Sequence, residues 1–183
     1  MDDDLLLILL AVVILLVVLY SQKDKITGRS DLIQDADVTT SKVLKNLKEF
    51  KPEIIPNRKN GFTEKDVEKQ LERYLKDIYQ HVTTQHGVEG TNAKAIDFDI
   101  GRGKVGIELK LAQEVIKEGG NDRLLGQVIK YSTRKYKDSN LIVALVGFAD
   151  DLRQTALSDL EDFLNEQNVK FSFLNAGSRS QVL

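Results

Sequence analysis

The sequence predicts an α/β protein, with a mixed sheet covered by helices on both faces and a single transmembrane helix before it. Three observations favour this class. Residues 95–111 alternate between apolar and polar side chains on either side of a Gly-Arg-Gly turn, which is typical of a β-hairpin. Residues 141–148 are almost wholly apolar, as expected of a strand buried on both faces. Stretches with apolar residues at helical spacing flank these strands, and the expected order of elements is α-β-β-β-α-β-α-β.

The N-terminal run, residues 5–20, contains only Leu, Ile, Val and Ala before it closes on Tyr20. As a helix it is short for a hydrocarbon core of about 30 Å, but Tyr20, Lys23 and Lys25 can extend it into the interface. We therefore expect an anchor over residues 1–20 in the cell membrane, with the rest of the chain in the cytoplasm because basic residues follow the run. The alternative is a cleaved signal peptide, which the acidic N-terminus and the lack of a small-residue cleavage site disfavour.

The rest of the chain divides into a tether, a globular domain and a tail. Residues 21–60 are polar and contain both prolines, so we interpret them as a tether. A short helix is expected within this tether, with an apolar side formed by Val43, Leu44 and Leu47. The globular domain is expected over residues 61–176, and a C-terminal tail over residues 177–183.

The first helix of the domain is expected from Thr63 to about residue 80. Thr63 can cap its N-terminus, because Asp66 stands three residues later as in a capping box. Its apolar stripe consists of Val67, Leu71, Leu75 and Ile78. A weakly indicated strand over residues 81–88 follows, and turn-forming residues separate it from the hairpin.

After the hairpin we expect a helix over residues 122–137, the apolar strand, a third helix and a last strand over residues 169–174. The apolar side of the third helix is formed by Leu152, Ala156, Leu160, Phe163 and Leu164. Strands and helices that alternate in this way are typical of a sheet with helices on both faces.

The polar side of the hairpin carries a pair of like charges that would destabilise the hairpin unless they had a function. A turn centred on Arg102 and Gly103 places Asp97 opposite Glu108, and like charges in a direct cross-strand pair are destabilising. Lys110 lies on the same face as Glu108. Two carboxylates beside a lysine suit a divalent metal, so the pattern predicts a metal-dependent nuclease. The alternative is an amphipathic hairpin whose charged side chains face water.

Mg²⁺ is usually held by one or two carboxylates together with substrate oxygens. The expected ligands are Asp97, Glu108 and the backbone carbonyl of Leu109. Asp97 is preferred over Asp99, because the register places Asp99 opposite Gly106. Lys110 would orient the attacking water or stabilise the transition state.

Composition excludes several other kinds of site. The chain has no cysteine, which excludes disulfides, thiolate zinc sites and cysteine nucleophiles. It has two histidines, His81 and His86, which we expect to be strand residues rather than ligands. The net charge is -2, so a nucleic-acid surface would have to come from local clustering of basic residues.

Asp97, the Glu108-Leu109-Lys110 triplet and the strand-helix-strand that follows resemble the PD-(D/E)xK nuclease superfamily, which has the restriction-endonuclease-like fold. The resemblance covers residues 61–174, and Ile96 stands where the family name has proline. It implies that Asp97, Glu108 and Lys110 form the catalytic and metal-binding set, with Mg²⁺ or Mn²⁺ as cofactor and DNA as substrate. Many members of the superfamily dimerise, so a homodimer is compatible with the resemblance.

The superfamily pattern has two further positions. Members often carry a glutamate on the first helix that reaches the metal through water, and Glu68 is the best match here. The alternative for Glu68 is a solvated helix glutamate. Many members also have a Gln-x-x-x-Tyr pattern on the helix after the Glu-x-Lys strand, which here is Gln127 and Tyr131. The resemblance therefore adds Glu68 and Gln127 to the catalytic set.

A basic stripe follows the same helix. Its members are Arg123, Gln127, Lys130, Arg134 and Lys137. They fall within about 80° of one another on a helix, and no acidic residue lies between the first and the last. We expect the four basic residues to contact a phosphate backbone, with Lys94, Arg102 and Lys104 as additions near the hairpin. The alternative is a solvated helix face.

These patterns predict a membrane-tethered, divalent-metal-dependent nuclease that acts on DNA at the cytoplasmic face of the membrane. Two alternatives use the same fold. One is a non-catalytic nucleic-acid-binding module, and the other is an interaction protein whose domain docks a partner. The intact set of Asp97, Glu108 and Lys110 favours the enzyme.

Overall fold

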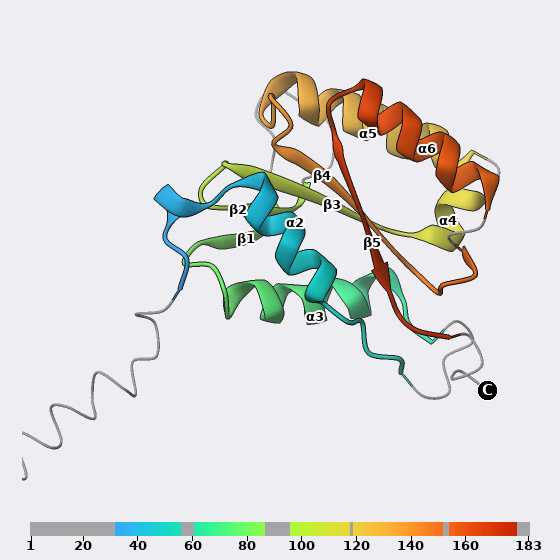
Figure 1. The fold of residues 1–183 in the computed structure, drawn as a ribbon, viewed down its shortest axis with the longest axis horizontal. Coiled ribbons are helices and arrows are strands. Elements are labelled where there is room, and N and C mark those ends of the chain that lie inside the picture. The colour runs from blue at the N-terminus through green and yellow to red at the C-terminus, as the bar shows by residue number, and fades with distance from the viewer. Residues whose placement is uncertain (1–31, 56–60, 87–95, 118, 152–153, 179–183) are drawn as a thin grey trace, which may run out of the picture. The chain divides into compact units, whose positions relative to one another are not determined.

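The structure, a computed structural model, describes residues 32–55, 61–86, 96–117, 119–151 and 154–178 (Figure 1). The chain divides into two units, Met1–Leu32 and Ile33–Leu183, and the fold described below is that of the second unit. Within the described residues, no helix has the length and apolar character needed to cross a bilayer. The anchor predicted over residues 5–20 lies outside the described residues, as does most of the predicted tail.

The centre of the domain is a five-stranded sheet with its strands in sequential spatial order. The strands are β1 Val82–His86, β2 Ile96–Ile100, β3 Val105–Leu111, β4 Leu141–Gly147 and β5 Lys170–Asn175. The first three strands pair antiparallel, whereas β3, β4 and β5 pair in parallel. The predicted mixed sheet is therefore confirmed.

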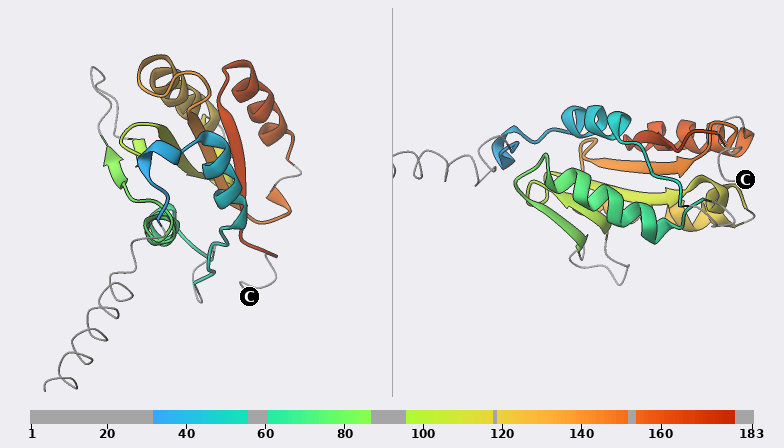
Figure 2. Two further views of the ribbon diagram at one scale, coloured as in Figure 1. Left: turned by 60° about the vertical axis from the view of Figure 1, so that its left-hand side comes forward. Right: turned by 90° about the horizontal axis from the view of Figure 1, so that it is seen from below.

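Helices cover both faces of this sheet (Figures 1 and 2). On one face lie α2 Thr40–Glu49 and α3 Glu64–Lys76, and on the other lie α4 Ala112–Ile116, α5 Gly120–Arg134 and α6 Thr155–Glu166. From α3 onward the elements follow the predicted order, with α4 as an addition between β3 and α5. A short 3₁₀ helix, Asp35–Asp37, precedes α2.

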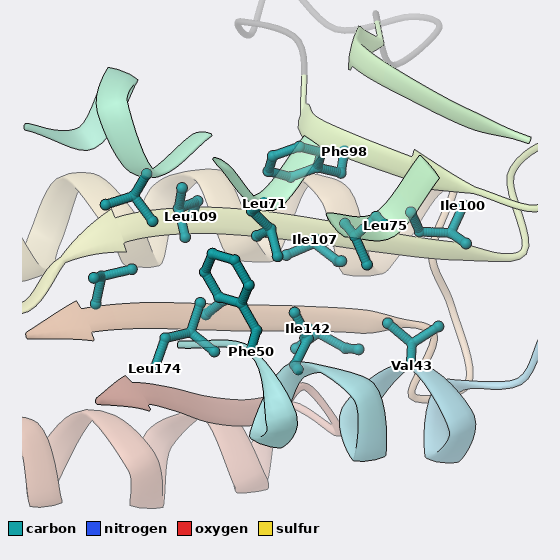
Figure 3. Packing of buried hydrophobic residues seen from close by; sticks show 14 of the residues in the cluster. Val43, Phe50, Leu71, Leu75, Phe98, Ile100, Ile107, Leu109, Ile142 and Leu174 are labelled. Carbon is teal, nitrogen blue, oxygen red and sulfur yellow. The ribbon is translucent and has the colours of Figure 1, made fainter. Parts of the chain in front are cut away.

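The core has one apolar layer on each face of the sheet. On the α2/α3 face, Leu71 and Leu75 of α3 pack toward Ile107 and Leu109 of β3 (Figure 3). On the opposite face, side chains of α5 and α6 such as Val128 pack against β4. All residues of β4 are buried, as its apolar sequence predicts.

The hairpin register agrees with the prediction. Ile100 pairs with Val105, and Asp99 pairs with Gly106. The turn between the strands uses left-handed backbone at Arg102, where φ is 56°, and at the glycine on either side of it. The side chains of β3 alternate, so that Ile107 faces the α2/α3 layer and Glu108 faces the other side of the sheet.

Gly106 lets the ring of Tyr136 approach the sheet. A Cβ on Gly106 would lie 2.6 Å from Ile96 Cδ1 and 2.8 Å from the Tyr136 ring. Tyr136 can therefore donate a hydrogen bond of 2.6 Å to Asp99, which also accepts from Lys135 Nζ at 2.7 Å. This network connects the hairpin to the segment after α5, so Asp99 is a structural residue.

The first helix of the domain is shorter than predicted. The capping box of Thr63 and Asp66 is present, but α3 ends at Lys76 rather than near residue 80. The chain turns there because Ile78 and Tyr79 leave the helix to pair with Ile33. The helix predicted over residues 122–137 is α5, Gly120–Arg134, and Leu152 of the third predicted helix lies outside the described residues.

Residues that we interpreted as part of a tether belong to the core instead. The predicted short helix is present as α2, and its Val43 and Leu47 are fully buried. Phe50 follows α2 and packs against Tyr74 of α3, with ring centroids 5.2 Å apart. The globular unit therefore starts at Ile33 rather than near residue 61. The sequence did not indicate that this helix belongs to the core, because its apolar side has only three residues and polar residues and prolines surround it.

Leu47→Ala is expected to lower the free energy of unfolding by about 2–5 kcal/mol, because it removes a fully buried side chain from the core. Urea denaturation of the wild type and the variant measures this change. Lys45→Ala is the matched control, because Lys45 is exposed on the same helix. If the two variants were equally stable, α2 would not be part of the cooperative core.

Candidate metal and nucleic-acid site

The candidate site is built on the paired strands β2 and β3. The ladder between them ends at the pair of Phe98 and Ile107, and Asp97 and Glu108 are the next residues of the two strands. Glu108 and Lys110 are two residues apart on β3 and project from the same face. Glu108 is only 1% exposed, whereas Asp97 and Lys110 are partly open to the cleft described below.

The ammonium of Lys110 lies among oxygen atoms from three elements. It donates to the Leu109 carbonyl at 2.6 Å and lies 3.1 Å from Glu108 Oε1. It also lies 3.3 Å from Glu64 Oε1, at the start of α3, and 3.5 Å from Asp97 Oδ2. Three carboxylates therefore surround a single ammonium, which leaves an excess of negative charge.

Two contacts fix the orientation of the carboxylates. Asp97 Oδ2 accepts a hydrogen bond of 2.7 Å from the backbone N–H of Leu109, which holds Asp97 against β3. Glu108 Oε1 faces Lys110. Glu108 Oε2 is buried and has no hydrogen-bond partner among the described residues. An unpartnered carboxylate oxygen is costly to bury, so a ligand at this atom would stabilise the arrangement.

Burial and mutual repulsion raise the pKa values of the carboxyl groups. Burial, and then the charge of Asp97, raise the pKa of Glu108 to about 7, although Lys110 opposes the shift. Burial also raises the pKa of Asp97 and that of Glu64, against the charge of Lys110. Burial alone would lower the pKa of Lys110, but the three carboxylates outweigh it and the pKa lies above its ordinary value.

If Glu108 is a metal ligand, as the sequence predicts, metal affinity is expected to rise with pH between about 6 and 8, because the ionised form of Glu108 would bind and its pKa is raised to about 7. Below that pKa the carboxyl group keeps its proton, and affinity should fall about tenfold for each pH unit. Electron paramagnetic resonance of free Mn²⁺ measures the affinity at each pH. A pH-independent affinity across this window would show that Glu108 is not a ligand.

Asp97, Glu108 and Lys110 form the floor of a cleft of about 750 Å³. One wall comes from α3, with Glu64 and Glu68, and from Gln85 of β1. The opposite wall comes from α4 and α5, and its polar members are Glu114, Arg123, Gln127 and Lys130. Within the described part of the chain, neither Arg123 nor Lys130 forms an ion pair.

The cleft brings together most of the residues predicted from the sequence. Lining it are Asp97, Glu108, Lys110, Glu68, Gln127, Arg123 and Lys130. Arg134 and Lys137 are exposed but do not line the cleft, because Arg134 is the last residue of α5 and Lys137 follows the helix. Any contact of these two residues with nucleic acid would lie outside the cleft.

The helix glutamate closest to the centre of the site is Glu64 rather than Glu68. Glu64 contacts Lys110, whereas Glu68 accepts a hydrogen bond of 3.4 Å from Gln85 farther along the wall. Glu64 is not among the site residues predicted from the sequence; it is the first residue of α3, next to the capping residue Thr63. Its spacing of four residues from Glu68, which puts both on one helix face, was the available signal.

The Gln127 and Tyr131 pattern lies beside the carboxylates. Tyr131 is fully buried and its hydroxyl forms a hydrogen bond with the side chain of Gln127. Burial, and then the charge of Glu108, raise the pKa of Tyr131 to about 12. The phenol of Tyr131 therefore keeps its proton over the physiological pH range.

The basic residues near the hairpin turn contact the segment before α2 rather than the cleft. Arg102 Nε lies 3.4 Å from Asp35, and the same Asp35 lies 3.0 Å from Nδ1 of His81. Lys104 donates to the carbonyl of Ala36. These contacts connect the hairpin turn to the segment before α2, so Arg102 and Lys104 do not join the cleft. Lys94 lies outside the described residues.

Among the described residues, no three His, Cys, Asp or Glu side chains form a group that could hold a metal ion by themselves. Mg²⁺ commonly uses fewer protein ligands than that and completes its shell with water and phosphate oxygens. Comparisons with protein-family models, with curated proteins and with solved structures found no match for this chain.

Proposed function

We propose that this chain is a divalent-metal-dependent nuclease that hydrolyses phosphodiester bonds, with DNA as its substrate. The observation that carries the proposal is the cleft in which Asp97, Glu108 and Lys110 face the basic side chains of α5. Carboxylates suit a hard cation, and unpaired basic side chains suit a phosphate backbone. As part of the proposal we assign the domain to the PD-(D/E)xK superfamily and its restriction-endonuclease-like fold.

The donor set fits Mg²⁺, with Mn²⁺ as a substitute. Asp97 and Glu108 offer carboxylate oxygens, the Leu109 carbonyl adds a third, and Glu108 Oε2 is buried without a partner. A bound Mg²⁺ would polarise a phosphoryl oxygen and make a nearby water more acidic.

The other residues of the cleft position the substrate and its charge. Lys110 carries a positive charge beside the carboxylates, where it can stabilise negative charge that develops on a phosphoryl group. Arg123 and Lys130 are about two helical turns apart on α5, so they can contact different phosphates of one strand. Gln127 lies between them, and its hydrogen bond with Tyr131 limits its rotation.

The test is cleavage of end-labelled single-stranded DNA, double-stranded DNA and RNA by the full chain. We expect cleavage of DNA with Mg²⁺ or Mn²⁺ and none with a chelator. DNA binding without cleavage under every condition would support the non-catalytic module instead. A chain that neither binds nor cleaves nucleic acid would overturn the proposal.

Replacing Arg123 and Lys130 together by glutamine is expected to weaken DNA binding about tenfold or more at low salt, because two phosphate contacts are lost. The slope of log affinity against log salt should fall by about 1.5 to 2. Fluorescence anisotropy across a salt series in Ca²⁺ measures both quantities. The control replaces Lys65 and Lys69, which are exposed on α3 and do not line the cleft. Equal losses in the two variants would contradict a specific role for α5.

We also propose that residues 5–20 anchor the domain to the cytoplasmic face of the cell membrane. The support is their apolar sequence and the basic residues that follow it. The full chain should remain in the membrane pellet after alkaline carbonate extraction, and a chain that starts at residue 21 should not. Release of both chains would exclude an integral anchor.

A further inference from the structure

We propose that the Lys110 ammonium is a built-in competitor of the divalent cation, and that Glu64 is the positioning residue that holds this ammonium when the cation binds. This inference rests on the proposed function, since it assumes that the cleft takes a divalent cation. It assigns to Lys110 a role in metal affinity, and to Glu64 a role that acts through Lys110.

The first step is the identity of the atoms that Lys110 contacts. Its ammonium lies 2.6 Å from the Leu109 carbonyl, 3.1 Å from Glu108 Oε1 and 3.5 Å from Asp97 Oδ2. These three residues supply all the expected metal ligands. Mg²⁺ coordinates oxygen at about 2.0–2.1 Å, which brings it into the space of an ammonium that contacts the same oxygens. The two cations therefore exclude one another from these positions.

The second step concerns Glu64 Oε1, the fourth oxygen atom near the Lys110 ammonium. Glu64 Oε1 lies 3.3 Å from Lys110 Nζ, and Glu64 comes from α3 rather than from the strands that carry the ligands. The Glu64 side chain is 34% exposed, so it lies toward the mouth of the cleft, while Glu108 lies at its buried floor. The flexible stem of Lys110 allows the ammonium to move to Glu64 without losing its last anionic partner.

The other charged groups around Lys110 leave Glu64 as the available partner. Asp97 and Glu108 are the carboxylates that the metal would take, and Glu114 on α4 lines the same cleft but makes no ion pair with Lys110 in the described structure. Arg123 and Lys130 on α5 are cations and would repel the ammonium. Glu64 is thus the carboxylate that contacts Lys110 and is free of the expected ligand set.

Competition of this kind lowers the apparent metal affinity of the wild type. Lys110→Met removes the competing charge and nearly preserves the length of the side chain. We expect Lys110→Met to bind Mn²⁺ about tenfold or more tightly than the wild type, although it should lose cleavage. Glu64→Gln removes the alternative partner, and we expect it to bind Mn²⁺ about fivefold more weakly.

A double-mutant cycle distinguishes this mechanism from one in which Glu64 itself binds the metal, directly or through water. If Glu64 acts through Lys110, Glu64→Gln should change Mn²⁺ affinity by less than about twofold when Lys110 is already methionine. If Glu64 served the metal directly or through water, the weakening would be the same in both backgrounds. That equality would overturn the role given to Glu64.

The experiment uses the full chain in mild detergent and measures free Mn²⁺ by electron paramagnetic resonance, with thermal melting to confirm that each variant is folded. Lys76→Met and Glu72→Gln are matched controls, because these residues form a lysine–glutamate pair at 2.6 Å on α3 and do not line the cleft. Neither control should change Mn²⁺ affinity. Equal or weaker Mn²⁺ binding by Lys110→Met would overturn the inference and leave the proposed nuclease standing.

A measurement on the wild type covers the case in which Lys110→Met does not fold. The ¹³Cε signal of Lys110 should shift when Mg²⁺ saturates the protein, since the ammonium changes partners. A signal that stays in place at saturating Mg²⁺ would overturn the inference. If Mn²⁺ binds to neither the wild type nor a folded Lys110→Gln, both this inference and the metal dependence of the proposed function are wrong.

Discussion

Glu108→Gln is expected to lower the rate of phosphodiester cleavage about 100- to 1,000-fold or more while leaving the fold intact. Glu108 is the most buried carboxylate of the cleft, and its Oε2 has no hydrogen-bond partner among the described residues. Glutamine keeps the size of the side chain but offers the cation a neutral oxygen and an NH₂ group. Lys110 keeps its contacts with Asp97 and Glu64, so the hairpin should not unfold.

Single-turnover cleavage of labelled DNA with Mg²⁺ measures this loss, and Mn²⁺ binding should weaken in parallel. Glu72→Gln is the matched control, because Glu72 pairs with Lys76 on α3 and does not line the cleft. The prediction would fail if Glu108→Gln cleaved at the wild-type rate. The same result would show that Glu108 is not a metal ligand needed for cleavage, which would contradict the proposed function.

The hairpin and the strand-helix-strand after it could be predicted because their patterns are local. The alternation of apolar residues predicted the register that pairs Asp99 with Gly106, which places Asp97 and Glu108 directly beyond the last pair of the ladder. The apolar sequence of β4 indicated burial on both faces, which requires helices on both sides of the sheet. The helix α5 followed from its spacing, and with it the positions of Arg123, Gln127 and Lys130.

The parts that the sequence did not predict depend on contacts between distant segments. The role of α2 in the core comes from Val43, Leu47 and Phe50, which find partners on the sheet and on α3. Nothing within the segment itself distinguishes such a helix from a partly structured tether. The contact of Glu64 with Lys110 joins residues 46 positions apart in the sequence, so it depends on where α3 lies against the sheet. Local spacing alone allowed Glu68 equally well.

Replacing Asp97 or Asp99 is expected to have opposite effects on stability and cleavage. The two residues are two positions apart on β2, but their side chains have different partners. Asp99→Ala is expected to lower the free energy of unfolding by about 3 kcal/mol or more. Asp99 is 2% exposed, and its loss would leave Tyr136 and Lys135 without their acceptor. The backbone N–H of Gly103 in the hairpin turn would also lose its 2.6 Å hydrogen bond.

Asp97→Ala should have the opposite profile. Asp97 is partly open to the cleft, and Lys110 still has Glu108 and Glu64 when Asp97 is removed. The backbone N–H of Leu109 loses its hydrogen bond to Asp97, but the repulsion between Asp97 and Glu108 is relieved. We expect its free energy of unfolding to stay within about 1 kcal/mol of the wild type, and its cleavage to fall at least about 100-fold. Urea denaturation and cleavage assays on both variants test the pair together. If Asp99→Ala were stable and Asp97→Ala unfolded, the two roles would be reversed. The register favoured Asp97 because it places Asp99 opposite Gly106, and the ring of Tyr136 above Gly106 gives the physical reason, since it provides Asp99 with a buried partner.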